Sequence, residues 1–193
     1  MNRFMLRAIK RSGLPVWYTE GFNPHYFITF IMPLSLGFET DCDIMEFKMD
    51  DDSVTNEEIA AAFAKVMPAN MKVLGAKDCV LKSKELKYAK FTVTLATKHV
   101  KEIKAFFETE QILVKKTTKK GIVNTVNLKE KIHFLNIAEN ENVQISLTLP
   151  AGSEENINPN LILDAMVEGG EIMFEVMNVT RNLLLDEGFG VFE

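Results

Sequence analysis

Hydrophobic and polar positions follow two different periods along the chain. Apolar residues recur every three to four positions in four segments, which predicts helices with one buried side at 3–12, 56–67, 98–109 and 159–168. Elsewhere apolar residues alternate with polar ones or form short unbroken runs, which is typical of strands. The predicted strands are 15–18, 27–32, 43–49, 71–74, 86–96, 112–117, 122–126, 132–137, 143–149 and 171–180.

Start and stop signals bound several of these elements. Thr55 and Glu58 have the spacing of a capping box, which predicts the beginning of the second helix. Gly13 follows the first helix and can take the left-handed conformation that ends it. Asn158-Pro159 opens the last helix, since proline is favoured in a first helical turn.

The order of these elements predicts the fold. The first third reads α-β-β-α-β, and one further strand in front would complete the β-α-β-β-α-β plan of a ferredoxin-like unit. The second part reads as the same plan again, with an inserted hairpin. We therefore expect an α+β fold with two ferredoxin-like units in tandem, at 1–80 and 81–193, the first lacking its leading strand.

The missing strand leaves two expectations open. Either the native N-terminus extends upstream of Met1, or another segment or chain supplies the strand. A homodimer formed through the incomplete first sheet would be one such arrangement.

Charge is segregated along the chain, although the net charge is only −5. Counting Lys and Arg against Asp and Glu, residues 1–20 carry +3 and 21–71 carry −7, whereas 72–131 carry +9 and 132–193 carry −10. A basic middle between acidic flanks is compatible with a footprint for nucleic acid or another anion. The alternative is that these are solvated faces whose charges cancel in the folded protein.

Composition limits the compartment and the chemistry. Arg3, Arg7 and Arg11 interrupt any apolar signal-peptide region, and no apolar run approaches the roughly 20 residues of a membrane helix. We expect a cytoplasmic protein with no membrane partner. Cys42 and Cys79 lack CxxC spacing, so we expect two free thiols, no metal site and no cofactor.

The first predicted helix places its basic residues on one side. Arg3, Arg7, Lys10 and Arg11 lie opposite the apolar positions, at a spacing that follows the helix. Such a side can bind phosphate groups, or it can be the solvated side of an amphipathic helix. Arg3, Arg7 and Arg11 are our candidate ligand-binding arginines.

The loop between the first two predicted strands carries the best candidate for a functional side chain. His25 can act as a general base or bind phosphate, or it can hold the turn through a hydrogen bond. Asn23 precedes a proline and can cap the turn or contact a ligand. The catalytic residues, if there are any, are not identified by the sequence, and His25 is the first to test.

Aromatic residues surround this loop. Trp17, Tyr18, Phe22 and Tyr26 can stack on nucleic-acid bases if they are exposed. They can equally pack in the core. The sequence leaves both roles open.

The same stretch carries a family resemblance. Residues 7–40 read RAIKRSGLPVWYTEGFNPHYFITFIMPLSLGFET and contain an Arg-Ala-x-x-Arg helix, a Gly-Phe-Asn-Pro-His loop and a Pro-Leu-x-x-Gly turn. This pattern resembles the radical SAM-linked proteins, a domain of unknown function found beside or fused to cobalamin-binding radical SAM proteins. The matching residues are Arg7, Ala8, Arg11, Gly13, Leu14, Pro15, Gly21, Phe22, Asn23, Pro24, His25, Pro33, Leu34 and Gly37.

The resemblance has limits and implications. Tyr26 replaces the second proline of the family loop, and the leading strand with its histidine is absent. The family association implies a radical SAM protein as partner. The chain has no CxxxCxxC of its own, so we do not expect it to be the radical enzyme.

Three functions remain as hypotheses. We favour a non-catalytic accessory or substrate-recognition module that acts with a radical SAM enzyme and binds RNA or another anionic ligand. The alternative is an RNA-processing or RNA-modifying enzyme that uses His25 with Arg7 or Arg11. A protein-interaction scaffold would be expected if the aromatic loop were buried and the basic residues dispersed.

Overall fold

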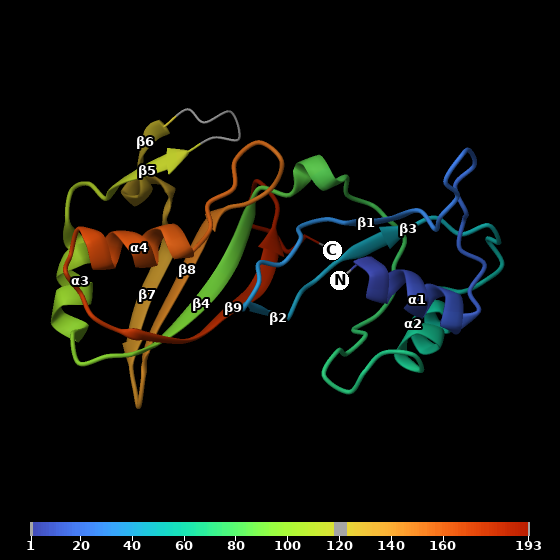
Figure 1. Ribbon diagram of the computed structural model, residues 1–193, viewed down its shortest axis with the longest axis horizontal. Helices are drawn as coiled ribbons and strands as arrows, with labels where there is room; N and C mark the ends of the chain where they lie inside the picture. The colour runs from blue at the N-terminus through green and yellow to red at the C-terminus, as the bar shows by residue number, and fades with distance from the viewer. Residues whose placement is uncertain (1, 118–122, 193) are drawn as a thin grey trace. The chain divides into compact units, whose positions relative to one another are not determined.

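The computed structural model describes residues 2–117 and 123–192, which form a mixed α+β fold. The helices are α1 Asn2–Ser12, α2 Asn56–Ala64, α3 Val100–Glu108 and α4 Asn160–Glu168 (Figure 1). The strands are β1 Ile28–Phe30, β2 Glu39–Thr40, β3 Met45–Phe47, β4 Tyr88–Ala96, β5 Leu113–Thr117, β6 Val123–Asn127, β7 His133–Glu139, β8 Val143–Pro150 and β9 Glu175–Leu185. Residue 122, the first of one predicted strand, lies outside the described residues.

The chain forms two compact units that are not simple halves of the sequence. The first unit comprises Met1–Ile31 and Ile44–Val80, and the second comprises Met32–Asp43 and Leu81–Glu193. The order of elements predicted a division at residue 80, and the contacts add residues 32–43 to the second unit. The backbone therefore passes between the units three times.

The first unit holds a small core. β1 and β3 pair antiparallel, with Ile28 opposite Phe47, and Val16 forms a single bridge to Met49. Ile9 of α1 packs with Val16 and with Ile59 and Phe63 of α2. The capping box at the start of α2 is present as predicted, since Thr55 Oγ1 accepts from the Glu58 amide at 3.2 Å and the Glu58 carboxylate accepts from the Thr55 amide at 2.9 Å.

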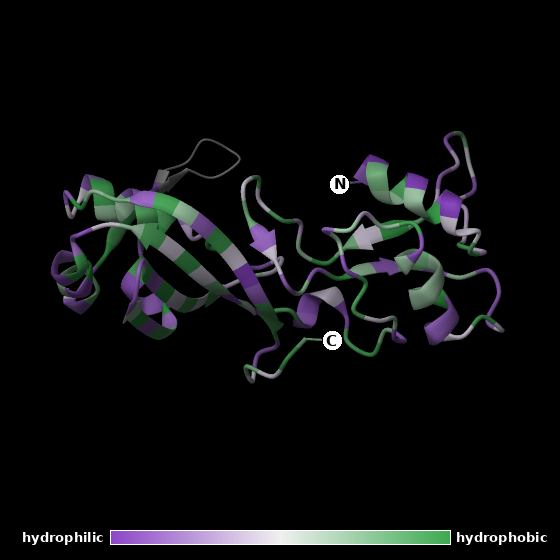
Figure 2. Cartoon of the chain, turned by 90° about the horizontal axis from the view of Figure 1, so that it is seen from below, coloured by the Kyte–Doolittle hydropathy of each residue, from purple (hydrophilic) through white to green (hydrophobic). Residues whose placement is uncertain are grey.

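The second unit is built on one five-stranded sheet with the order β2-β9-β4-β8-β7. β4 pairs antiparallel with β8 and β9, and β7 pairs antiparallel with β8. β4 alternates between buried and half-buried residues along its whole length, and Figure 2 shows the matching alternation of hydropathy along the long strands. α3 buries Ile103 and Phe107, and α4 buries Ile162 and Met166.

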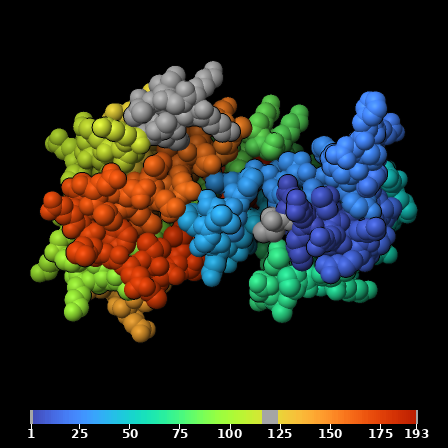
Figure 3. All heavy atoms as spheres, viewed as in Figure 1, coloured from blue at the N-terminus to red at the C-terminus, as the bar shows by residue number. Residues whose placement is uncertain are grey.

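Residues 32–43 extend this sheet at its edge. β2 pairs parallel with β9, with Glu39 opposite Thr180 and Thr40 opposite Arg181. In Figure 3 the light-blue atoms of this segment lie beside the orange and red atoms of the second unit. The sequence pattern predicted no strand here, because two residues are too few to show a period.

Two predicted strands are wrong in part or in whole. Residues 71–74 form no strand, because Leu74 is exposed and no neighbouring strand pairs with this stretch in the described part of the chain. The prediction of a strand at 15–18 is reduced to single bridges at Val16 and Tyr18.

The last strand begins and ends later than predicted. Glu171 has a φ of 50°, and the Ile172 amide donates to Met166 O at 3.0 Å, so residues 171–172 close α4 rather than join the sheet. The polar pair Arg181-Asn182 interrupts the apolar pattern, although β9 continues through it to Leu185.

Candidate functional site

The aromatic loop, residues 17–27, is closed by its own backbone. The Thr19 amide donates to His25 O at 2.8 Å, and the His25 amide donates to Thr19 Oγ1 at 3.0 Å. Tyr18 and Tyr26 form the bridge just outside this pair. Gly21 has a φ of 116°, a conformation that strongly favours glycine, so the turn depends on this residue.

His25 holds the turn and still presents one ring nitrogen to solvent. Its Nδ1 lies 2.8 Å from Asn23 O and 3.2 Å from Thr19 Oγ1. A carbonyl oxygen only accepts, so Nδ1 is the donor in this contact, and in the neutral ring Nε2 then carries the lone pair. The hydrogen bonds show that His25 holds the turn, and the ring is exposed, so the role as a base or phosphate ligand stays a prediction.

Asn23 contributes its backbone rather than its side chain to this arrangement. Its carbonyl oxygen accepts from His25, while the residue as a whole is exposed. The predicted cap through the Asn23 side chain is therefore replaced by a contact through the main chain.

The aromatic side chains divide into exposed and packed groups. Phe22 is fully exposed at the tip of the loop, and Tyr18 is 48% exposed. Trp17 meets Phe27 edge-to-face at 5.8 Å, with the Lys48 ammonium 5.1 Å from the Trp17 ring centroid. Tyr26 contributes to the core of the first unit.

The basic side of α1 is exposed along its whole length. Arg3, Arg7, Lys10 and Arg11 are all exposed, and Ala8 and Ile9 are buried on the opposite side. Arg3 lies in the first turn, where the helix dipole disfavours a cation. Arg11 Nη2 reaches Val66 O at 3.5 Å, and none of the four makes an ion pair with a described residue.

The predicted site residues fall into two groups within the first unit. Asn23 and His25 are joined to one another, and the arginines share the side of α1. No hydrogen bond or ion pair among residues 2–117 and 123–192 connects the arginines with His25. The catalytic set of His25 with Arg7 or Arg11 is therefore not assembled by direct contact.

Part of the basic middle of the sequence is neutralised by the acidic C-terminal part. Lys87 Nζ lies 2.6 Å from Glu154, and Lys131 Nζ lies 2.9 Å from Glu155. These pairs agree with the interpretation in which charges cancel in the folded protein. The basic side of α1 differs from them, because within the described ranges it forms no ion pair with an acidic side chain.

The described residues contain no group of three histidine, cysteine or acidic side chains placed to hold a metal ion. No helix within the described ranges is both long and apolar enough to cross a bilayer.

Sequence reasoning missed a buried ion pair in the second unit. Arg181 on β9 is 1% exposed, and its Nη2 donates to Asp43 Oδ1, just after β2. Arg181 is the only basic residue in positions 132–193, which carry eleven acidic ones. That isolated cation inside a strand is the signal that could have found the pair.

Comparison with known proteins assigns the chain to a family without assigning a reaction. Among curated proteins, none matches the sequence. The family model described as "Uncharacterized protein conserved in bacteria (DUF2344)" matches residues 1–159. That range contains α1, the aromatic loop and the segment that forms β2. The chain therefore belongs to the DUF2344 family, a domain of unknown function conserved in bacteria.

Proposed function

We propose that this protein is a recognition module, not catalytic on its own, that binds an anionic partner through the basic side of α1 and the aromatic loop. RNA is the partner we favour. The observation that carries the proposal is the combination of four exposed cations that form no ion pair with a described residue and an exposed Phe22 and Tyr18 in the same unit.

The chemistry of the two surfaces suits a nucleic acid. Arginine binds phosphate oxygens through a planar array of donors, and exposed aromatic rings stack on bases of any sequence. His25 Nε2, which carries a lone pair in this tautomer, can accept a hydrogen bond from a ribose hydroxyl or a base. An anionic protein surface would also satisfy the arginines, but a single-stranded nucleic acid offers the exposed rings a base to stack on at every nucleotide.

We further propose a radical SAM protein as the functional partner. Support comes from the resemblance of residues 7–40 to the radical SAM-linked proteins, whose motif residues occupy α1 and the aromatic loop. In that setting the module would present a substrate to the partner enzyme. Copurification of the two proteins tests this association, and its absence at low salt would count against it.

The fold proposal also remains the tandem ferredoxin-like plan. In the second unit, the antiparallel order β9-β4-β8-β7, with α3 and α4 between strands, supports it. In the first unit β3 is the one strand that pairs with β1 among the described residues, and the other edge of β1 is one that a strand from a second copy could fill. Measurement of the solution mass tests the homodimer.

Binding of single-stranded RNA over a salt series tests the main proposal. We expect affinity to fall steeply with salt, because phosphate contacts release counterions. Replacing Arg3, Arg7 and Arg11 together by alanine should weaken binding and reduce the slope of log affinity against log salt by about 2. The matched control replaces three exposed lysines of the second unit, Lys98, Lys101 and Lys104, and should leave most of the affinity intact.

A second variant separates stacking from charge. Phe22→Ala should weaken RNA binding by about 1–3 kcal/mol without changing the salt slope. The exposed Phe134 of the second unit provides the matched phenylalanine control. Equal losses in the arginine and lysine triple variants, or binding without salt dependence, would contradict the proposal.

An RNA-processing or RNA-modifying enzyme remains the second candidate, because the His25 ring is exposed and its tautomer is fixed. The test is incubation of RNA with wild-type protein and with His25→Ala. Processing that is lost in the variant would favour the enzyme. Processing that is unchanged, or absent from both, would leave only the recognition module.

A further inference from the structure

A small cavity lies entirely within the second unit, away from the residues of the proposed function. It has a volume of about 30 Å³ and is lined by residues 32–35, Phe38, Phe91, 156–159 and Arg181. Pro33 and Asn156 are exposed at its rim, whereas Ile157, Pro159 and Arg181 are buried. A cavity of this volume has room for about two or three non-hydrogen atoms, but it cannot enclose a larger molecule completely.

Arg181 brings an unsatisfied donor to this cavity. The side chain is 1% exposed, and its Nη2 donates to Asp43. Its Nε is buried and has no hydrogen-bond partner in the described part of the protein. An unpaired buried N–H costs about 1–3 kcal/mol, and more when the group is charged, so an acceptor at this position would be stabilising.

Other polar groups in the lining are also arranged to donate. Asn158 Nδ2 donates to Ser35 Oγ at 3.0 Å, which leaves the Ser35 hydroxyl hydrogen able to point to a ligand. The Asn158 side-chain oxygen is already used, because it accepts from the Asn160 amide at 2.9 Å. The Ser35 hydroxyl can therefore donate to a ligand, whereas the Asn158 side-chain oxygen already accepts a hydrogen bond from within the protein.

The helix that begins at the cavity adds a favourable field but no open amides. α4 starts at Asn160, and its N-terminal end carries a partial positive charge. The amides of Leu161 and Ile162 are paired with Asn158 O and Pro159 O at 3.0 Å each. Arg181 Nε–H and the Ser35 hydroxyl are therefore available as donors for direct contact.

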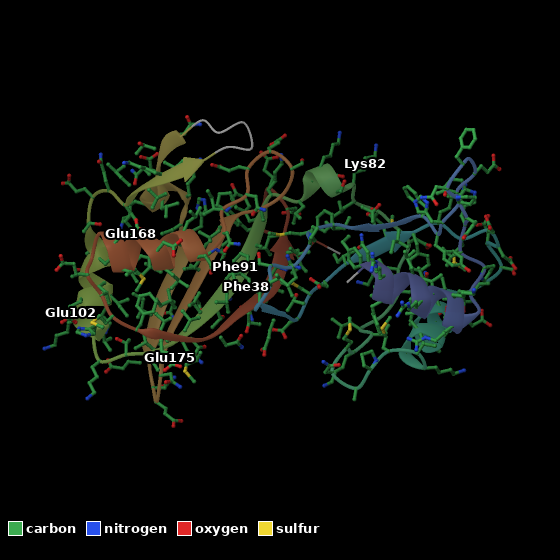
Figure 4. All side chains as sticks on the ribbon, viewed as in Figure 1. Phe38, Lys82, Phe91, Glu102, Glu168 and Glu175 are labelled. Atoms are coloured by element: carbon green, nitrogen blue, oxygen red, sulfur yellow. The ribbon has the colours of Figure 1, made fainter. Side chains whose placement is uncertain are left out.

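Aromatic and aliphatic side chains form the remaining walls. Phe38 and Phe91 meet edge-to-face, with ring centroids 6.4 Å apart, and Figure 4 labels them close together, near β2 and β9. Met32, Pro33 and Leu34 also line the cavity. These side chains supply the apolar part of a lining whose surface is mainly polar.

We propose that this cavity binds the carboxylate group of a small organic acid, whose remaining atoms extend past Pro33 and Asn156. A carboxylate only accepts hydrogen bonds, so it matches the Arg181 Nε–H and Ser35 hydroxyl donors of this cavity. Water and amides also carry hydrogen-bond donors, which need acceptors in the lining, whereas a carboxylate carries none.

Asp43 does not exclude a second carboxylate. It is bound to Nη2, it is not part of the cavity lining, and its side chain is 29% exposed, so solvent screens part of its charge. The positive end of α4 acts in the opposite direction. One guanidinium can then bridge two carboxylates through separate nitrogens.

Formate is the probe, and the Nε–H resonance of Arg181 in a ¹⁵N-labelled protein is the readout. The chain contains only four arginines, and Arg3, Arg7 and Arg11 are exposed. A variant with these three replaced by lysine leaves Arg181 as the source of the remaining arginine Nε–H signal. The cavity itself is unchanged in this variant.

We expect the Arg181 signal to shift with formate and to saturate in the millimolar range, while chloride at the same ionic strength leaves it in place. Formamide has the same shape without the charge and should shift it far less. Acetate should bind if the methyl group extends past the rim. Ser35→Ala should weaken formate binding roughly tenfold, because it removes one donor to a charged group.

Two results would overturn the proposal. Equal shifts with formamide would show that any neutral acceptor fills the site. No shift with formate up to about 200 mM would show that the cavity holds water only. Because lysine keeps the positive charge, the variant with lysine at positions 3, 7 and 11 is expected to bind both RNA and formate. The variant with alanine at these positions is expected to lose RNA affinity and keep formate binding, so failure of one proposal is distinguishable from failure of the other.

Discussion

The pairing of Arg181 with Asp43 joins positions 138 residues apart in the sequence. Asp43 also accepts from Thr40 Oγ1 at 3.2 Å, and the Asp41 amide donates to Arg181 O at 2.9 Å. A buried cation is expensive unless it is paired, so the pair is needed once Arg181 lies in the sheet.

We predict that Asp43→Ala lowers the free energy of unfolding by about 3 kcal/mol, because it leaves the guanidinium buried without its counterion. Asp43→Asn should cost less, since the amide oxygen can still accept. Urea denaturation of the full chain measures both. Asp41→Ala is the matched control, since Asp41 is exposed and contacts Asn182 at 3.1 Å, and a loss there as large as at Asp43 would contradict the argument.

The two thiols should differ in reactivity. Burial raises the pKa of Cys42, and burial together with Glu46 raises the pKa of Cys79. A raised pKa lowers the thiolate fraction at neutral pH, so both should react with iodoacetamide more slowly than a free thiol and should accelerate as the pH rises. Cys79 should react first, because it is exposed and Cys42 is half-buried.

Mass spectrometry of iodoacetamide labelling in the Cys42→Ser and Cys79→Ser variants assigns each of the two labelling rates to its cysteine. Glu46→Gln should speed up Cys79, because it removes a negative charge that opposes the thiolate. Faster labelling of Cys42 than of Cys79 in the wild-type protein would contradict the burial argument.

At the scale of elements, α2 shows a local signal with a measurable consequence. Thr55→Ala removes the side-chain acceptor for the Glu58 amide and should destabilise the first unit by about 1 kcal/mol. Loss of far-UV circular dichroism against temperature measures the effect. Thr125→Ala on β6, an exposed threonine, makes the same chemical change without a helix cap and should have little effect.

The elements predicted well are those with signals inside one segment. The capping box placed the start of α2, and strict alternation placed β4. β2 and the full length of β9 depend on a partner far along the chain, which no local period reports. The strand predicted at 71–74 had suitable residues, but no described segment pairs with it.

The candidate site follows the same rule. His25 and the basic side of α1 were found because their residue types and spacing lie within one short stretch. Arg181, Ser35 and Asn158 come from three separate segments, and their meeting is a property of the folded second unit. Only the isolated charge of Arg181 was visible beforehand.

For the whole molecule, burial is unequally divided between the units. Of the buried apolar side chains among the described residues, five lie in the first unit (Ala8, Ile9, Val16, Ile59 and Phe63) and 24 in the second. Because apolar burial is the main stabilising term, the first unit should open more readily.

Hydrogen exchange followed by mass spectrometry tests this inequality. Amides of α1, α2, β1 and β3 should exchange under conditions in which those of β4 and β8 stay protected. The paired segment at 39–40 should follow the slower unit, because it hydrogen-bonds to β9. Uniform protection of both units would show that they unfold as one cooperative body.

Residues 32–43 belong to the second unit, although they lie between two segments of the first unit. A single cut in the sequence therefore cannot separate the two units. A gene divided after codon 80 would encode a downstream piece with a bare edge at Thr180 and a buried cation deprived of its counterion. Shuffling, duplication or fusion at that junction would therefore give a folded second unit only if residues 32–43 were moved together with the rest of its sheet.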